Sequence, residues 1–309
     1  MTHQEQQQEP DFFMSPAEMK INAQQQQQPA FFTSPAELEQ IARTRPVELI
    51  EDFVPSGGVM VLAGAPGLGK SFTALSWAAA IAEGSEWFGR RVRQAPVVYV
   101  LGEGWGGFGD RIAAWQKDNG RPMSEQVHFV NGVPLGVNLK DPDAVQQLIA
   151  QVEPVRPGLI IVDTFSVLAR VSNENDNAEV AAVMFNVNAI AQATGATVML
   201  VHHVTKTTGS VRGASAFVGN ADTVVVAGVD VRDGAASDGF MLSTEARHGG
   251  KQRDGEAKTL RGFKITWPGV LDRDDVTGAG QYNPNAVKDP NEIMAKAMAV
   301  HESKKEQEN

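Results

Sequence analysis

From Val59 onward, short apolar runs rich in β-branched residues alternate with longer amphipathic stretches. The apolar runs predict strands and the amphipathic stretches predict helices. Because the apolar runs are almost uninterrupted by polar residues, they favour a mostly parallel sheet buried between helices. We expect strands at Val59–Ala63, Val97–Leu101, Val127–Val130, Leu159–Val162, Thr197–Val201 and Thr223–Ala227, and helices at Ser71–Ala82, Phe108–Lys117, Asp143–Val152 and Ala178–Ala193.

The pattern changes after Ala227. Strands are expected at Phe240–Thr244 and Gly262–Trp267 with a Gly- and Asp-rich connection, so antiparallel strands should extend the parallel sheet. The predicted fold class is therefore α/β, with a mostly parallel central sheet flanked by helices and antiparallel C-terminal strands. We expect one domain over residues 46–277 and a polar tail over 278–309 that frays.

Residues 1–45 form a Gln-rich stretch that is expected to stay flexible. It contains a repeat, PDFFMSPAEMKI from Pro10 and PAFFTSPAELEQI from Pro29. Each copy places Ser, Pro and Glu where a capping box needs them, so each should begin a short helix. One copy could dock on the domain while the other is a decayed duplicate. Alternatively, both copies present a motif to a replication or repair partner.

Composition narrows the class of protein. The 309 residues include no cysteine, which excludes disulfides, thiolate metal sites and cysteine nucleophiles. No apolar run is long enough for a membrane helix and the N-terminus does not resemble a secretory signal, so a cytoplasmic protein is expected. The net charge of −10 argues against general adhesion to nucleic acid but leaves room for a local basic patch.

The segment Gly64–Ser71 matches the phosphate-loop pattern GxxxxGK[ST] between an expected strand and an expected helix. Its backbone N–H groups and the helix N-terminus would surround phosphate, Lys70 would reach the β- and γ-phosphates, and the Ser71 hydroxyl would ligate Mg²⁺. ATP and Mg²⁺ are therefore the expected ligands. The nucleotide-binding residues we expect are Gly64, Ala65, Pro66, Gly67, Leu68, Gly69, Lys70, Ser71, Phe72 and Asp163.

Asp163 ends the apolar run Leu159–Val162, where a carboxylate would lie beside the Mg²⁺ shell. It is followed by Thr164 and not by the Glu that often activates water in phosphate-loop ATPases. The best substitute is Glu103, just after the strand Val97–Leu101. If that strand neighbours the phosphate-loop strand, Glu103 should emerge at the same sheet edge as Lys70 and act as the general base. A solvated Glu in a Gly-rich loop is the alternative.

These motifs together resemble the RecA-like ATPases. The phrase VHHVTKTTGSVRGASAFVGNADTVVV resembles one branch, the plasmid replicative helicases of the RepA type and their phage relatives. The resemblance extends from about Val47 to Trp267. It implies that a residue at the end of strand Thr197–Val201 senses the γ-phosphate, and we favour His202 over His203 for this role. A histidine that only packs in the core is the alternative.

The string KQRDG from Lys251 resembles the Lys-x-Arg element of DnaB-type ring helicases. That resemblance implies that Lys251 and Arg253 reach a neighbouring subunit's γ-phosphate, where cations stabilise the transition state. A basic β-turn without this role is the alternative.

Two loops would face the channel of such a ring, at about 165–178 and 205–219. Lys206 and Arg212 in the second loop are expected to contact nucleic-acid backbone. The first loop carries only Arg170 and an acidic run, so a solvated or partner-facing loop is equally consistent. Trp105, after Glu103, could stack on a base or pack in the core.

The sequence thus predicts a RecA-like ATPase that works as a homo-oligomeric ring, a hexamer by resemblance, and moves on single-stranded DNA as a helicase does. The alternatives are an accessory ATPase that binds DNA without unwinding it, and a nucleotide-gated switch that recruits a partner through the N-terminal repeats.

Overall fold

The computed structural model describes residues 33–44, 48–203, 214–232, 235–253, 255–266 and 270–273. Contacts divide the chain into two units, Met1–Arg45 and Pro46–Asn309. The predicted tail from residue 278 and the first repeat copy from Pro10 lie outside the described residues.

Helix α2 (Pro35–Thr44) lies in the first unit and begins where the second repeat copy predicts. The capping box is formed: Ser34 N donates to Glu37 Oε2 at 2.7 Å, and Glu37 N donates to Ser34 Oγ at 3.3 Å. Leu38 and Ile41 on this helix are exposed.

The central sheet of the second unit has six parallel strands in the order β8-β3-β7-β6-β4-β5. The predicted parallel sheet is therefore confirmed. The strands are β3 (Gly58–Gly64), β4 (Val97–Leu101), β5 (Val127–Asn131), β6 (Leu159–Asp163), β7 (Thr197–His203) and β8 (Thr223–Arg232).

Antiparallel strands extend this sheet beyond β8, as the change of pattern after Ala227 predicts. They are β9 (Ala235–Ser243), β11 (Thr259–Thr266) and β12 (Val270–Arg273), in that spatial order. A short strand, β10 (Lys251–Gln252), pairs with the start of β8 after the turn η2 (Ala246–His248). A separate ribbon of β1 (Glu48–Ile50) and β2 (Val54–Pro55) was not expected from the sequence.

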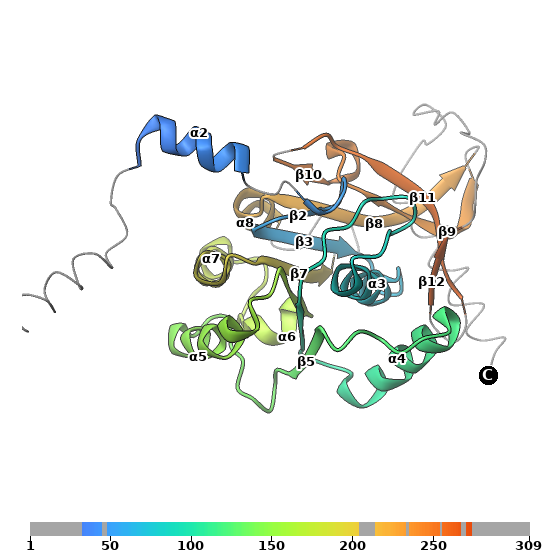
Figure 1. Cartoon of the computed structure of the whole chain (residues 1–309), viewed down its shortest axis with the longest axis horizontal. Helices are drawn as coiled ribbons and strands as arrows, with labels where there is room; N and C mark the ends of the chain where they lie inside the picture. The colour runs from blue at the N-terminus through green and yellow to red at the C-terminus, as the bar shows by residue number, and fades with distance from the viewer. Residues whose placement is uncertain are drawn as a thin grey trace, which may run out of the picture. The chain divides into compact units, whose positions relative to one another are not determined.

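Helices pack on both faces of the sheet (Figure 1). One core lies under α3 (Lys70–Glu83) and α4 (Trp105–Asn119). The other lies under α5 (Pro142–Val152), α6 (Phe165–Ala169), α7 (Asn177–Thr194) and α8 (Ala214–Asn220), with the turn η1 (Glu153–Val155) after α5. None of the described helices has the length and apolar character needed to cross a membrane.

The chain order of these helices makes the carboxyl edge of the sheet the expected place for a ligand. The helices that follow β3 and β4 lie on one face, whereas those that follow β5, β6 and β7 lie on the other. In open α/β sheets, ligands bind where the connections diverge in this way. The carboxyl ends of β3, β6 and β7 meet at this point, with β7 between the other two.

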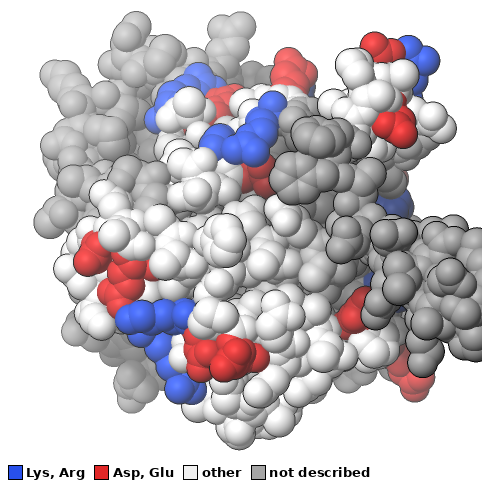
Figure 2. Space-filling model, turned by 90° about the vertical axis from the view of Figure 1, so that its left-hand side faces the viewer, with Lys and Arg blue, Asp and Glu red and all other residues white. Residues whose placement is uncertain are grey.

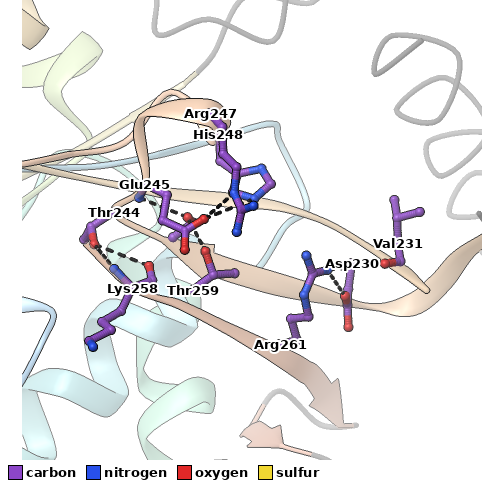
Figure 3. Close-up of polar contacts among 10 residues, drawn as sticks. Asp230, Val231, Thr244, Glu245, Arg247, His248, Lys258, Thr259 and Arg261 are labelled. Carbon is purple, nitrogen blue, oxygen red and sulfur yellow. Dashed lines mark hydrogen bonds and ion pairs between the residues drawn. The ribbon is translucent and has the colours of Figure 1, made fainter. Parts of the chain in front are cut away.

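An ion pair joins the antiparallel strands to the parallel sheet (Figure 3). Asp230 on β8 is fully buried, and its Oδ1 accepts a hydrogen bond from Arg261 Nη1 at 2.7 Å. Its other oxygen accepts the backbone N–H of Gly262 at 3.1 Å. The register of β8 with β9 shifts beside Asp230, and that of β9 with β11 shifts beside Gly262. The carboxylate therefore accepts a backbone N–H at a point where the ladder is irregular.

Candidate functional site

The phosphate loop connects β3 directly to α3, as its motif predicts. Two glycines are required by the packing around it. A Cβ on Gly64 would lie 2.7 Å from the carbonyl oxygen of Ala227. Gly69 has φ +69°, and a Cβ there would lie 3.0 Å from the side chains of Phe240 and Ile265. Side chains of the antiparallel strands β9 and β11 thus pack against the phosphate loop at Gly69.

Lys70 is almost completely buried inside this loop. Its Nζ donates to the carbonyl oxygens of Gly64 and Ala65, each at 2.9 Å. Burial lowers the pKa of Lys70 to about 8, although the negative charges of Asp163 and Glu103 oppose this shift. A bound phosphate group would add further negative charge beside the buried ammonium and so favour its charged form.

Asp163 lies at the end of β6, and its side chain is on the same sheet face as α3. It is 4% exposed, and burial raises its pKa despite hydrogen bonds from the Tyr99 and Ser71 hydroxyls and the nearby charges of Arg111 and Lys70. The link to Ser71 brings together the two residues predicted to hold Mg²⁺.

Glu103 emerges at the same edge, although not for the predicted reason. Strand β4 does not neighbour β3, because β7 and β6 lie between them. Instead β4 pairs with β6, with Leu101 opposite Asp163. The Thr164 hydroxyl donates to Glu103 Oε1 at 3.3 Å. Thr164 stands where many ATPases have a catalytic Glu. It therefore contacts Glu103, the carboxylate that we expected to replace that missing Glu.

Two further side chains near Asp163 were missed by the sequence analysis. Tyr99 on β4 donates its hydroxyl to Asp163 Oδ2 at 2.7 Å. Arg111 on α4 lies with its Cζ 5.0 Å from the Phe72 ring centroid and 5.4 Å from that of Phe108. One signal in the sequence could have pointed to each of them. Tyr99 carries the one hydroxyl in an otherwise apolar strand, and Arg111 follows Phe108 by three residues, which places both on one face of a helix.

The sensor role of His202 stays a prediction, and the surroundings of this residue favour the alternative of a histidine that packs in the core. This side chain is fully buried and stacks on Phe217, with ring centroids 4.4 Å apart, while Phe165 contacts it edge-on. It belongs to the sheet face opposite α3, as do Val198 and Leu200 on the same strand. Since side chains alternate along a strand, His203 projects toward the face that carries α3 and Asp163. His203 also pairs with Gly64, the first residue of the phosphate loop.

Lys251 and Arg253 lie at the other end of the sheet. Gln252 between them pairs with Thr223, which in turn pairs with Met60 near the start of β3. Lys251 Nζ donates to the carbonyl oxygens of Val218 and Ala221, both at 2.6 Å, around the end of α8. Arg253, whose side chain is 52% exposed, forms an ion pair with Asp222.

Both residues predicted to contact nucleic acid, Lys206 and Arg212, lie outside the described residues. The first expected channel loop begins with helix α6, where Phe165 and Leu168 are fully buried, so this part packs in the core and faces no channel. Trp105 is 46% exposed, which leaves its ring available for stacking.

Charge on the face covered by α5, α7 and α8 is sparse (Figure 2). Helix α7 carries a single charged residue, Glu179, which accepts Lys140 Nζ at 2.5 Å and the backbone N–H groups of Ser172 and Asn173. These bonds lower the pKa of Glu179 to about 2, with the bond from Lys140 the largest cause. The described residues on this face form no continuous basic track.

The chain also matches a known protein family. The family model for an AAA domain matches residues 25–209, more than half of the chain. The chain belongs to this AAA domain family. Together with the convergence of Lys70, Ser71 and Asp163 at one sheet edge, this membership identifies an ATPase with a phosphate-loop core.

Among solved structures, a KaiC-like protein from the hyperthermophilic archaeon Pyrococcus horikoshii is 18% identical, with a TM-score of 0.47. The match covers 72% of this chain and 93% of that one. A likeness at this level adds nothing to the family assignment. No curated protein matches the chain.

The family implies a nucleotide bound with a divalent metal, generally Mg²⁺. The donor set fits, because the Ser71 hydroxyl and the Asp163 carboxylate offer the oxygen ligands that Mg²⁺ prefers. In the part of the chain that the structure describes, no cluster of three or more His, Asp or Glu could hold a metal by itself. Such a site suits an ion that also takes phosphate oxygens and water as ligands.

Proposed function

We propose that this chain hydrolyses ATP at the carboxyl edge of its sheet and uses the energy as a homo-oligomeric motor on single-stranded DNA. The observation that carries the hydrolytic part is the convergence of Lys70, Asp163 and Glu103 around the phosphate loop, where both carboxylates act on the charge of Lys70. Positioning and electrostatic stabilisation are the main contributions a protein makes to phosphoryl transfer.

Each residue has a distinct role in this proposal. Lys70 leaves the carbonyls of Gly64 and Ala65 and binds the β- and γ-phosphates. Mg²⁺, held beside Ser71 and Asp163, would neutralise charge on the phosphate oxygens. Glu103, oriented by the Thr164 hydroxyl, accepts a proton from the attacking water.

His203 takes the place of His202 as the residue that senses the γ-phosphate. Its pairing with Gly64 and its side of the sheet favour this assignment. His202 instead acts through packing, since it lies between Phe165 and Phe217.

The oligomeric part of the proposal is supported by where Lys251 and Arg253 lie. They are at the amino edge of the sheet, so they cannot serve the phosphate loop of their own chain. A cation that completes the site of a neighbouring copy has to lie away from its own site in this way, because head-to-tail contacts join two different faces. The half-exposed Arg253 fits this role better than Lys251, which is held at the end of α8.

Single-stranded DNA as the track rests on the resemblance to RepA-type and DnaB-type helicases in the segments around His203 and Lys251. Lys206 and Arg212 would contact its phosphates, summed over the copies of an oligomer. An accessory ATPase that binds DNA without unwinding it is the second candidate. Separation of a forked duplex in the presence of ATP distinguishes the two.

The testing experiment is steady-state ATP hydrolysis over a range of protein concentrations, with and without single-stranded DNA, at low and moderate salt. We expect a rate per subunit that rises with protein concentration and is stimulated by DNA at low salt. Lys70→Ala is the control for contaminating activity. A rate that depends on neither concentration nor DNA would leave an ATPase and exclude both the oligomeric motor and its DNA track.

The N-terminal repeats give a separate proposal, that α2 and its copy bind a replication or repair partner. Exposed Leu38 and Ile41 on α2 support it. Removal of residues up to Gln40 should leave ATP hydrolysis intact and abolish capture of that partner.

A further inference from the structure

A buried hydroxyl contacts the carboxylate of Asp163, one of the two residues proposed to hold Mg²⁺. Tyr99 is fully buried in the middle of β4, and its Oη donates to Asp163 Oδ2 at 2.7 Å. The register explains the contact. Leu101 pairs with Asp163, and Tyr99 stands two positions earlier on the same sheet face. The phenol ring spans that offset of roughly 6.6 Å along the strand.

The ring of Tyr99 alone accounts for packing at this position. Its centroid lies 5.1 Å from that of Phe108 and 5.7 Å from that of Phe129. A phenylalanine would keep both contacts. The hydroxyl therefore matters through its hydrogen bond to Asp163, since a hydroxyl placed in an apolar core is costly unless it has a partner.

We propose that Tyr99 is a positioning residue that occupies one oxygen of Asp163, turns the other toward the metal, and thereby favours Mg²⁺ over Ca²⁺. This inference rests on the proposed ATP hydrolysis at the same site. Mg²⁺ demands octahedral geometry and keeps several waters, whereas Ca²⁺ readily takes both oxygens of one carboxylate. Chelation by both oxygens would make Oδ2, which accepts from Tyr99 Oη, share its electron density between the phenol and the cation, and this weakens that mode of binding.

The neighbouring side chains strengthen this constraint. The Ser71 hydroxyl lies close enough to favour the charged form of Asp163, and Arg111 and Lys70 place positive charge nearby. Asp163 is thus approached from the core by Tyr99 and from the phosphate loop by Ser71 and Lys70. Loss of the bond from the core would leave the carboxylate free to rotate about its Cβ–Cγ bond.

The test uses Tyr99→Phe in the full chain. Binding of a fluorescent ATP analogue is measured by equilibrium titration with Mg²⁺ and separately with Ca²⁺. We expect the half-saturating Mg²⁺ concentration to rise about tenfold, as for one lost hydrogen bond to a charged group. The Ca²⁺ value should stay the same or fall, so that the preference for Mg²⁺ declines.

Thr197→Val is the matched control. Thr197 is a fully buried hydroxyl at the opposite end of β7, where it donates to Pro55 O at 2.7 Å and accepts from Gly57 N at 2.8 Å. This variant should lower the unfolding temperature without changing the Mg²⁺ to Ca²⁺ ratio.

Two results would overturn the inference about Tyr99 alone. One is a folded Tyr99→Phe protein with the parental metal ratio, and the other is an equal change of that ratio in Thr197→Val. A parent protein whose nucleotide binding ignores both metals would overturn the proposed function, and this inference with it.

Discussion

Glu103 and Thr164 are joined by a hydrogen bond that the sequence does not predict. The sequence shows that Thr164 stands where a general base often follows the strand-end Asp, and that Glu103 is the best replacement. It does not show that the Thr164 hydroxyl contacts Glu103, because that contact depends on β4 pairing with β6. The order of strands in a sheet is a long-range property that local apolar runs do not encode.

Removal of the Thr164 hydroxyl should therefore slow the chemical step. For Thr164→Val we expect kcat to fall about tenfold with little change in KM, since a hydrogen bond to a charged group is worth about 1.5–3 kcal/mol and 1.4 kcal/mol corresponds to a factor of ten. Thr164→Ser should retain most activity. In a Glu103→Gln background, which should itself lose about 100-fold, Thr164→Val should add nothing. An equal further loss there would show that Thr164 acts independently of Glu103.

The buried ammonium of Lys70 predicts a pH dependence of ATP binding. Its pKa is lowered to about 8 in the free protein, and bound phosphates would stabilise the charged form and raise it. Affinity should then be constant below pH 8 and weaken as the pH rises above 8, by up to about tenfold per pH unit. Calorimetry in buffers of different ionisation enthalpy should detect proton uptake near pH 9.

Lys70→Arg is the control for this pH dependence, because arginine keeps its charge throughout the range. Its affinity should be weaker and nearly independent of pH between 7 and 9. A parent protein with a flat profile over the same range would contradict the assignment to Lys70.

At the scale of elements, the sequence predicted the buried parallel strands well. Val97–Leu101 has the observed bounds, and Leu159–Val162 ends one residue early. The C-terminal strands were predicted too short because β8 and β9 extend through polar residues near Asp230, where the ladder is irregular. Helix α6 was missed because its five residues make little more than one turn, too few for the apolar pattern of a helix to repeat.

The alternation of side chains along a strand could have shown that His202 and His203 lie on opposite faces of the sheet. Side chains of a strand alternate between faces, so only one of His202 and His203 can lie on the face of Asp163. The sequence does not tell which face receives α3. The structure settles this, because Val201 shares the core of α3 whereas Leu200 lies in the other core.

The ion pair of Asp230 with Arg261 predicts where the antiparallel strands are vulnerable. Asp230→Ala would remove the buried carboxylate that forms the ion pair with Arg261 and accepts the N–H of Gly262. We expect a loss of about 3 kcal/mol in the free energy of unfolding, measured by denaturant titration. Glu256→Ala, which breaks the exposed pair with Lys258, should change stability little. Equal effects of the two variants would contradict the structural role of Asp230.

At the scale of the whole molecule, the phosphate loop and the pair Lys251 and Arg253 lie at opposite edges of one sheet. A single copy therefore holds both parts of the proposed site, the phosphate loop and the cations, but too far apart to act on one nucleotide. This arrangement has a consequence that does not depend on how many copies assemble. Each complete site takes its phosphate loop from one copy and its cation from the next.

Arg253→Ala and Lys70→Ala should each abolish hydrolysis, and their mixture should recover it. In a random mixture of equal parts, about a quarter of the contacts join an intact phosphate loop to an intact Arg253, so about a quarter of the parental rate is expected. Because Arg253 also pairs with Asp222 in its own chain, Asp222→Asn is the necessary control. It breaks that pair, leaves Arg253 in place, and should keep most activity. If Asp222→Asn is as inactive as Arg253→Ala, or the mixture stays inactive, Arg253 acts only within its own chain and each copy must complete its site in another way.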